Sequence, residues 1–262
     1  GVRTARRPCL HRDDDGKNSL MTFADHFSGH AALYAAARPT YPDSLIAEIA
    51  ALAPGRTRAW DVGTGNGQSA VMLAEHFDAV FASDASASQI AQAFPDERVT
   101  YAAEPAEQCS LADQSCDLIL ASQCIHWFDH PHFFAEAKRV LRPGGLLAAI
   151  GYGWFYVDPQ IDEIVGRTLL KPLDPHWQAG NWLLIDGYRA LDFPGREIRL
   201  TPAAIHLAWN RDQFCNYVRS WSAVQRLGEQ VAERAFAELA RAWPDGERRH
   251  VVMPIVSRAA RI

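Results

Sequence analysis

Three alternating glycines, Gly63, Gly65 and Gly67, follow the acidic residue Asp61 in the stretch AWDVGTGNGQSA. Alternating glycine builds neither a good helix nor a good strand, because glycine loses the most conformational freedom on folding. It does permit a tight turn and lets a ligand lie against bare backbone. A helix that follows such a turn offers free N–H groups to a polar or anionic part of the ligand. The stretch therefore predicts a ligand-binding loop, with a purely structural turn as the alternative.

The spacing of the glycines distinguishes this loop from the known phosphate- and nucleotide-binding loops. A dinucleotide-binding loop has the pattern G-x-G-x-x-G, whose third glycine is replaced here by Gln68. A P-loop requires Gly-Lys-Ser/Thr, which is absent from the stretch. What remains is an acid followed by three alternating glycines, with Thr64 inside the turn. This pattern disfavours a nicotinamide-dependent oxidoreductase and a P-loop nucleotidase.

Strand and helix patterns alternate around this loop. Short apolar strands are predicted at 60–63, 79–83, 99–103, 118–121 and 146–153, with helices at 43–52, 68–77 and 131–141, and RPGG as a turn before the fifth strand. This alternation predicts an α/β fold with a doubly wound, mostly parallel sheet that is covered on both faces. Ligands of such sheets bind beyond the carboxyl ends of the strands, which is where the glycines lie.

The second half of the chain breaks this rhythm. Residues 152–195 are rich in aromatic residues and proline, which indicates a lid. Strands at 196–200, 204–209 and 249–259 and helices at 210–222 and 229–243 are predicted to follow. The predicted division is a disordered tail at 1–20 and one domain at 21–262, which contains N-terminal helices at 22–52, a cofactor-binding core at 56–152, a helical lid at 153–195 and a part that completes the sheet at 196–262.

The same features, in the same order, resemble the class I S-adenosylmethionine-dependent methyltransferases. The resemblance rests on the glycine run, on Asp84 at the end of the second strand, and on the stretches AEPAEQCSLADQSCDLILASQCIHWF and LRPGGLLAAIGY. YAAARPTYPDSL further resembles the methyltransferase type 11 subgroup that includes trans-aconitate methyltransferase-like proteins. The resemblance implies a seven-stranded sheet and S-adenosylmethionine as the cofactor.

The resemblance also implies roles for individual residues. Asp84 would accept hydrogen bonds from both ribose hydroxyls, as one carboxylate can, although it also stands where it could cap a helix. Asp61 would lie near the ammonium group of the methionine part, and Arg38 near its carboxylate, unless Arg38 is an exposed charge at a helix end. The other residues that would line the cofactor are Gly63, Thr64, Gly65, Gly67, Ala106, Glu107, Ser122 and Gln123.

His126 follows the fourth strand at the mouth of the predicted pocket. A histidine can remove a proton from an acceptor near neutral pH, so His126 is the candidate catalytic residue, with a hydrogen-bonded wall residue as the alternative. A carboxylate acceptor would need no base. Trp127, Phe128, Tyr152 and Trp154 either face the sulfonium or simply pack in the core. His130 and His132 look like part of a metal site, but a helix start after Asp129 explains them better.

Composition narrows the class of function. The formal net charge of −5 argues against a nucleic acid as partner. Five scattered cysteines without CxxC spacing disfavour a disulfide framework or a zinc site and suit the cytoplasm. No apolar run is long enough to span a membrane. The sequence thus predicts methylation of a small-molecule acceptor, most simply on oxygen, without a metal. The alternative is a non-catalytic module that binds S-adenosylmethionine or S-adenosylhomocysteine; the oligomeric state stays open.

Overall fold

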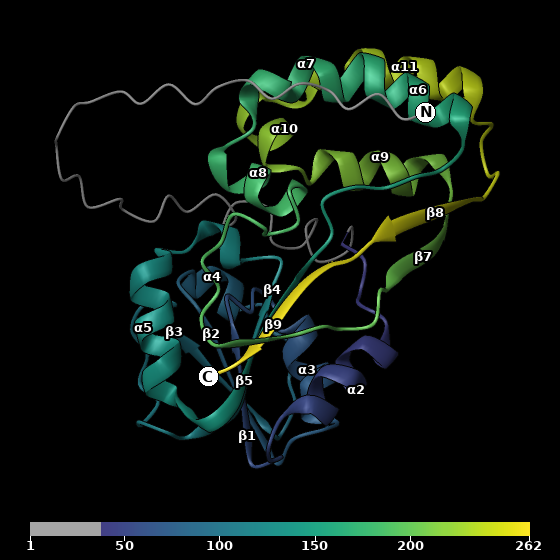
Figure 1. Ribbon diagram of the computed structural model, residues 1–262. Helices are drawn as coiled ribbons and strands as arrows, with labels where there is room; N and C mark the ends of the chain where they lie inside the picture. The colour runs from purple at the N-terminus through teal and green to yellow at the C-terminus, as the bar shows by residue number, and fades with distance from the viewer. Residues whose placement is uncertain (1–37) are drawn as a thin grey trace, which may run out of the picture.

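A central sheet of seven strands organises the protein. The computed structural model describes residues 38–262 (Figure 1), so the predictions for the tail at 1–20 and for a helix within 22–37 lie outside the described residues. The strand order is β3-β2-β1-β4-β5-β9-β6. Strands β1 to β5 pair in parallel, and β9 is antiparallel to both β5 and β6. The predicted fold class is therefore confirmed. The strands are β1 (Arg58–Val62), β2 (Ala79–Asp84), β3 (Val99–Ala103), β4 (Cys116–Ser122), β5 (Leu141–Gly151), β6 (Arg196–Ile198) and β9 (Val256–Arg261).

Strand β4 shows why the sheet lies inside the molecule. Its six residues Cys116 to Ala121 are all buried. Leu118 and Leu120 belong to one hydrophobic cluster, and Ile119 and Ala121 belong to the other, on the opposite face. This alternation follows from the two-residue period of a strand. Helices cover the two faces: α2 (Asp43–Leu52), α3 (Gln68–Ala74), α4 (Ala87–Ile90) and α5 (His130–Val140), with the short 3-10 helix η2 (Ile125–Trp127) after β4.

Strand β5 begins earlier than the sequence predicts. RPGG was expected to form a turn, but the strand starts at Leu141 and includes these residues. The backbone of Ile262 explains the difference, because its N–H donates to the Gly145 carbonyl and its own carbonyl accepts from the Gly144 N–H. The left-handed φ of +77° at Gly144 and a register shift between Cys116 and Leu118 mark this irregular start.

A second layer, the helical cover (residues 155–185 and 204–254), lies over one end of the sheet (Figure 1). It contains most of the predicted lid and also the C-terminal helices, which the sequence assigned to different parts. Phe155 packs on Phe214 at 5.2 Å between ring centroids, and Arg167 pairs with Glu238. Its helical segments are α6 (Pro159–Val165), a π-helical turn η3 (Gly166–Leu170), α7 (Lys171–Leu173), η4 (Asp174–His176), α8 (Ala179–Ile185), α9 (Arg211–Arg219), α10 (Ser222–Leu227), η5 (Glu229–Ala232) and α11 (Glu233–Ala242).

Two predictions for the C-terminal part are wrong in detail. The last strand was expected to be continuous, but it divides at Ile255 into β8 (Arg249–Pro254) and β9. Strand β8 pairs with β7 (Ala204–Trp209) in a separate two-stranded sheet, so only β6 and β9 complete the main sheet. Pro254 favours this break because it has no N–H to donate to a continued ladder.

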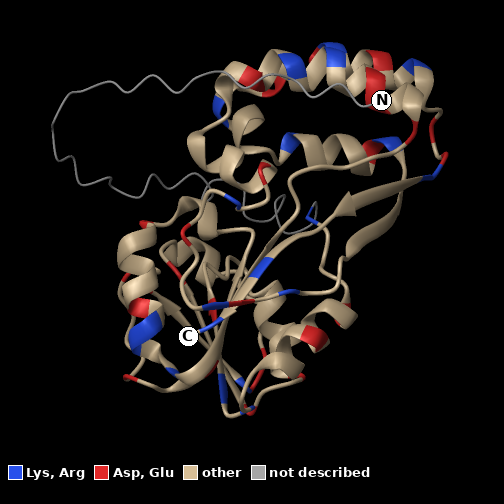
Figure 2. Cartoon of the chain, viewed as in Figure 1, with Lys and Arg blue, Asp and Glu red and all other residues tan. Residues whose placement is uncertain are grey.

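Charged residues lie mainly on the outer helices of the cover and at the sheet's far end (Figure 2). On α11, for example, Ala235 and Leu239 are buried while Arg234 and Glu238 form an ion pair on the outer side. Within residues 38–262, no helix combines the length and apolar character that crossing a membrane requires.

Candidate functional site

The glycine loop joins β1 to α3, and its three glycines have left-handed φ values of +65°, +57° and +86°. Their surroundings differ. A Cβ on Gly63 would lie 2.8 Å from the Cys124 thiol, and one on Gly67 would overlap the Tyr101 phenol. A Cβ on Gly65 would meet only Gln89 Oε1, at 4.0 Å. Gly63 and Gly67 therefore allow close packing inside the protein, whereas Gly65 is the position where a ligand can approach bare backbone.

Asp61 is fully buried at the base of this loop. Thr64 Oγ1 donates to Asp61 Oδ2 at 2.5 Å, while Oδ1 has no hydrogen-bond partner among the described residues. Burial raises the pKa of the Asp61 carboxyl to about 7, with a smaller contribution from the negative charge of Asp84. A buried carboxylate with one unsatisfied oxygen is costly in isolation. It suits a ligand that brings a cationic hydrogen-bond donor to Oδ1, which fits the ammonium of S-adenosylmethionine.

Asp84 ties the glycine loop to the end of β2. Its Oδ2 accepts from the Gly65 N–H at 2.9 Å, and its Oδ1 accepts from the Ser86 N–H at 2.8 Å. Ser86, not Asp84, is the N-cap of α4. The helix-cap alternative for Asp84 is thus replaced by a bridging role between the two loops, and its role toward a ribose stays a prediction.

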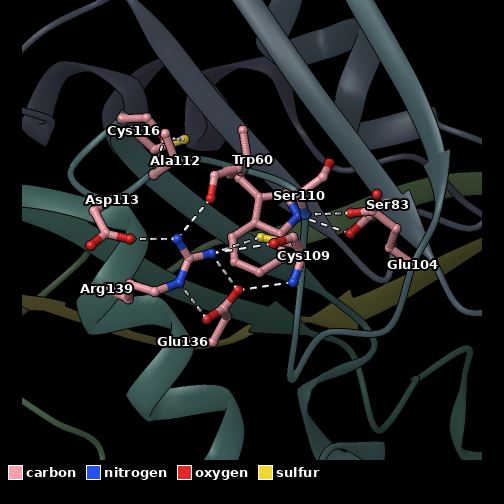
Figure 3. A network of polar contacts seen from close by, with 12 residues as sticks. Trp60, Ser83, Glu104, Cys109, Ser110, Ala112, Asp113, Cys116, Glu136 and Arg139 are labelled. Atoms are coloured by element: carbon pink, nitrogen blue, oxygen red, sulfur yellow. Dashed lines mark hydrogen bonds and ion pairs between the residues drawn. The ribbon is translucent and has the colours of Figure 1, made fainter.

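Ala106 and Glu107 lie on the loop after β3, which is fastened to α5. Arg139 on α5 binds Glu136, Asp113 and the Leu111 carbonyl, as the network in Figure 3 shows. The Arg139 guanidinium lowers the pKa of Glu136 to about 2. Ala106 is buried, and the Glu107 carboxylate accepts from the Asp129 N–H at 2.9 Å. The loop is therefore held rigidly, while its contact with an adenine stays a prediction.

Ser122 and Gln123 close the end of β4. Ser69 Oγ on α3 donates to Ser122 Oγ at 2.9 Å. Gln123 has a left-handed φ of +58°, and its side chain binds the backbone of Tyr152 twice: Nε2 donates to the carbonyl at 3.0 Å and Oε1 accepts from the N–H at 2.8 Å. The ends of β4 and β5 are thus joined through one side-chain amide.

His126, on η2, is buried beside Trp127, whose ring centroid lies 4.8 Å away. Its Nδ1 is 3.1 Å from the Tyr188 hydroxyl. Burial lowers the pKa of His126 to about 3, and the charge of Arg38 adds to this. A ring that stays neutral is a weak base, so the structure favours the wall and positioning role. His130 Nε2 donates to the Ile125 carbonyl at 2.9 Å, and His132 pairs with Asp129 at the start of α5.

A pocket of about 410 Å³ opens between the sheet and the helical cover. Gln123, His126 and Tyr152 line it from the sheet side, and Trp127 and Trp154 do so as well. Arg38 also lines it; its guanidinium donates to the Ser220 carbonyl at 3.4 Å and lies 5.8 Å from the Tyr217 ring. Arg38 is therefore not simply an exposed helix-end charge.

Phe128 does not line this pocket. It packs edge-to-face on Phe133 at 4.9 Å between centroids. This contact favours core packing as the role of Phe128. Among residues 38–262 no group of three or more potential ligands is placed to hold a metal ion.

Sequence reasoning missed the pocket residues that the cover contributes, notably Leu170, Lys171, Asp174, Tyr217 and Trp221. Two features of the sequence could have pointed to this segment. Pro172 lacks the N–H that a regular helix needs at that place, and the chain adopts a π-helical turn at Gly166–Leu170 just before it. Such turns often accompany functional sites. Lys171 is also one of only three lysines, against 23 arginines.

Comparisons with known proteins agree on one family. A family model described as a methyltransferase domain matches residues 60–149. The solved structure of a protein assigned as a type II methyltransferase from Anaeromyxobacter dehalogenans is 41% identical, with a TM-score of 0.77, and the match covers 86% of this chain and 97% of that one. An assigned methyltransferase from an antibiotic biosynthesis pathway of Anabaena variabilis, 15% identical with a TM-score of 0.51 over 81% of this chain and 98% of that one, shares the fold.

Two curated relatives match over a shorter stretch. An assigned methyltransferase of Dictyostelium discoideum is 39% identical over 132 residues, which is 50% of this chain and 50% of that protein. An assigned S-adenosylmethionine-dependent methyltransferase of Saccharomyces cerevisiae is 27% identical over 139 residues, or 50% of this chain and 46% of that protein. The matched stretch thus spans about half the length of these relatives.

Proposed function

The chain belongs to the class I S-adenosylmethionine-dependent methyltransferases, and we propose that it transfers the methyl group of S-adenosylmethionine to an oxygen of a small-molecule acceptor. The observation that carries this proposal is the position of the 410 Å³ pocket. It reaches Gln123 and Tyr152 at the carboxyl ends of β4 and β5. The strand order reverses between β1 and β4, and ligands of doubly wound sheets bind at this point.

Several contacts support a binding site for the cosubstrate at the glycine loop. The unsatisfied Oδ1 of Asp61 suits its ammonium group, and the backbone at Gly65 suits close approach. Asp84 lies at the end of β2, and its carboxylate suits the ribose hydroxyls. We propose that Ala106, Glu107, Ser122 and Gln123 border the remaining atoms and that Arg38 meets the carboxylate. S-adenosylmethionine, when bound, supplies an electrophilic methyl group and leaves as a neutral thioether, so no acid is required from the chain.

The remaining task of the protein is to position the acceptor oxygen against the methyl group. Bringing the acceptor oxygen to about 3–3.5 Å of the methyl carbon, in line with the bond that breaks, can supply most of the acceleration. The aromatic wall of Trp127, Tyr152 and Trp154 would exclude water from this encounter. His126 is neutral because its pKa is about 3, so it suits a hydrogen bond to the acceptor better than proton removal. This supports a carboxylate, which needs no base, over an amine or an alcohol.

Other features support the proposed class of acceptor and the proposed cellular compartment. The net charge of −5 fits a small molecule better than a nucleic acid. The likeness of YAAARPTYPDSL to the trans-aconitate methyltransferase-like subgroup also points to a carboxylate. All four cysteines within residues 38–262 are free thiols, which supports a reducing compartment such as the cytoplasm.

An acceptor screen tests this proposal. Purified protein is incubated with S-adenosylmethionine and a panel of small carboxylic acids, alcohols and amines, and release of S-adenosylhomocysteine is measured. We expect turnover with members of the acid or alcohol groups and none with the amines. Turnover confined to amines would refute the oxygen assignment, and cofactor binding without turnover of any acceptor would favour a binding module.

A further inference from the structure

The pocket concentrates the tryptophans of the protein. Of eight tryptophans in the chain, five line this one pocket: Trp127, Trp154, Trp177, Trp182 and Trp221. Trp154 and Trp182 are 40% and 44% exposed, although both are large apolar side chains. Exposed apolar surface gathered at a concave site indicates a place where an apolar partner binds.

The ring contacts indicate the shape of that partner. Trp177 packs on Trp221 at 5.8 Å between centroids, and Trp154 stacks on Phe155 at 6.3 Å with only 18° between the planes. Trp182 has no ring partner among the residues that the structure describes. The outer indole of the Trp154 stack and the ring of Trp182 therefore offer flat faces, and flat apolar molecules gain most from such faces.

Charges at the pocket indicate a polar group on the same partner. Lys171 comes from α7 in the cover, and within residues 38–262 neither a hydrogen bond nor an ion pair engages its ammonium group. Asp174, three residues further on, also lines the pocket without a described ion pair. Arg38 also lines the pocket, but it is proposed above to meet the carboxylate of the cosubstrate, so Lys171 is the lining cation that is left for the acceptor. Lys171 favours one negative charge on the acceptor, and the carboxylate of Asp174 opposes a second.

From these two observations we propose that the acceptor is a planar aromatic molecule with a single acidic group, its ring lying against Trp154 and Trp182 and its acidic group reaching Lys171. This rests on the proposed function and adds the substrate class to it. Helix α7, which carries Lys171, belongs to the cover (Figure 1), whereas His126 on η2 and Gln123 directly after β4 line the pocket from the sheet side. The acidic group is then the carboxylate proposed above as the methyl acceptor, held between Lys171 on the cover and the sheet side of the same pocket. Lys171 is a specificity residue, because it selects and orients this carboxylate.

Three probes with one ring system test the proposal: indole-3-acetate, indole-3-ethanol and tryptamine, which are acidic, neutral and cationic. Each is titrated into the full-length protein by calorimetry and tryptophan fluorescence, with and without saturating S-adenosylhomocysteine. We expect the acid to bind more tightly than the alcohol, by up to about fivefold, as for an exposed ion pair, and the amine to bind most weakly. A small aliphatic tricarboxylate should bind more weakly than indole-3-acetate.

Matched variants test whether the preference for the acid arises at Lys171. Lys171→Gln should remove the preference for the acid, whereas Lys138→Gln, which neutralises an exposed lysine on α5 outside the pocket, should leave it unchanged. Asp174→Asn should strengthen binding of the acid. Trp182→Ala should weaken binding of all three probes and reduce the change in tryptophan fluorescence that they cause.

Four results would overturn the inference. They are equal binding of acid and alcohol, equal effects of Lys171→Gln and Lys138→Gln, preferred binding of the amine that Asp174→Asn abolishes, and absence of binding by all three probes. Binding of S-adenosylhomocysteine is measured first in the same protein. If the protein does not bind S-adenosylhomocysteine, the result counts against the proposed function. If it binds S-adenosylhomocysteine and gives any of these results, only the acceptor class is contradicted.

Discussion

The side-chain amide of Gln123 binds both backbone groups of Tyr152, donating to its carbonyl at 3.0 Å and accepting from its N–H at 2.8 Å. Tyr41 adds a longer hydrogen bond to the same Gln123 oxygen, at 3.5 Å. One residue after β4 thereby fixes the first residue after β5, and both line the pocket. The rim of the proposed acceptor site is thus built by a contact between the ends of neighbouring strands.

Gln123→Ala should destabilise the protein by about 1–3 kcal/mol, because it leaves two backbone groups of Tyr152 without their partners. Gln114→Ala is the matched control, since Gln114 has a similar left-handed φ of +50° but is exposed on a turn. Urea unfolding of both variants separates the loss of the amide contact from the cost of the backbone conformation. Equal destabilisation of the two variants would argue against the amide contact.

Gly65→Ala and Gly67→Ala should have opposite consequences. A Cβ at Gly67 would overlap the Tyr101 phenol, so this variant should lose stability by about 1–3 kcal/mol or more. A Cβ at Gly65 would meet only Gln89 Oε1, at 4.0 Å, so this variant should lose only the roughly 1–2 kcal/mol that a side chain costs at a left-handed φ, but it should bind S-adenosylhomocysteine at least about tenfold more weakly. Thermal unfolding and calorimetric titration measure the two effects; unchanged affinity of folded Gly65→Ala would place the ligand elsewhere.

Asp84→Asn should weaken S-adenosylhomocysteine binding by about 1.5–3 kcal/mol, the range for lost charge-assisted hydrogen bonds. Asp78→Asn is the control, because Asp78 is exposed immediately before the same strand, at its other end. Since Asp84 also accepts from the Gly65 N–H, circular dichroism should accompany the titration. A folded Asp84→Asn variant with the affinity of the unmodified protein would rule out the ribose assignment.

Asp61 should make both stability and cofactor affinity depend on pH. Its carboxyl has a pKa of about 7 in the folded chain and an ordinary low value when unfolded. The folded state therefore holds a proton that the unfolded state releases, and stability falls as pH rises from about 4 to 7, by up to about 1.4 kcal/mol per pH unit. Asp61→Asn should lack this slope in urea unfolding.

Binding should change with pH in the opposite sense. A ligand ammonium beside Asp61 favours the ionised carboxylate, so affinity for S-adenosylhomocysteine should rise between pH 6 and 8 and then level off. Adenosine, which has no ammonium group, should bind without this trend, and Asp61→Asn should remove it. Parallel pH profiles for the two ligands would refute contact between Asp61 and the ammonium.

His126 should stay neutral throughout the physiological range, because burial holds its pKa at about 3. Nitrogen-15 NMR of the labelled ring, assigned through His126→Gln, should show no titration of this residue between pH 5 and 8. Titration near pH 6.5 would restore the alternative of a general base. An unchanged turnover of His126→Gln with an identified acceptor would leave this histidine as part of the wall alone.

The core of the fold is predictable from the sequence because its signals are local. The predicted strand at 118–121 lies within β4, and the helix begins after Asp129 as predicted. Buried parallel strands are short apolar runs, and an aspartate followed by a proline in the first turn caps a helix. The glycine loop is likewise readable from composition. The different structural roles of Gly63, Gly65 and Gly67 cannot be read in this way. They depend on Cys124, which follows β4, and on Tyr101 in β3, both distant in sequence.

The cover could not be assembled from the sequence. Phe155 meets Phe214, and Trp177 meets Trp221, across more than forty residues of chain, and no periodicity encodes such pairs. Division of the last strand at Ile255 depends on the Ala203 carbonyl, to which Ile255 donates. The place of Lys171 at the pocket similarly depends on how the two halves of the cover pack.

Calorimetric titration of the purified full-length chain with S-adenosylmethionine, S-adenosylhomocysteine and NAD tests the central claim most directly. The account predicts binding of both sulfur ligands with micromolar affinity and no binding of NAD, because Gln68 stands where a dinucleotide loop has its third glycine. Absence of binding by both sulfur ligands, in folded protein that carries no bound ligand, would contradict the claim and leave the glycine run as a turn.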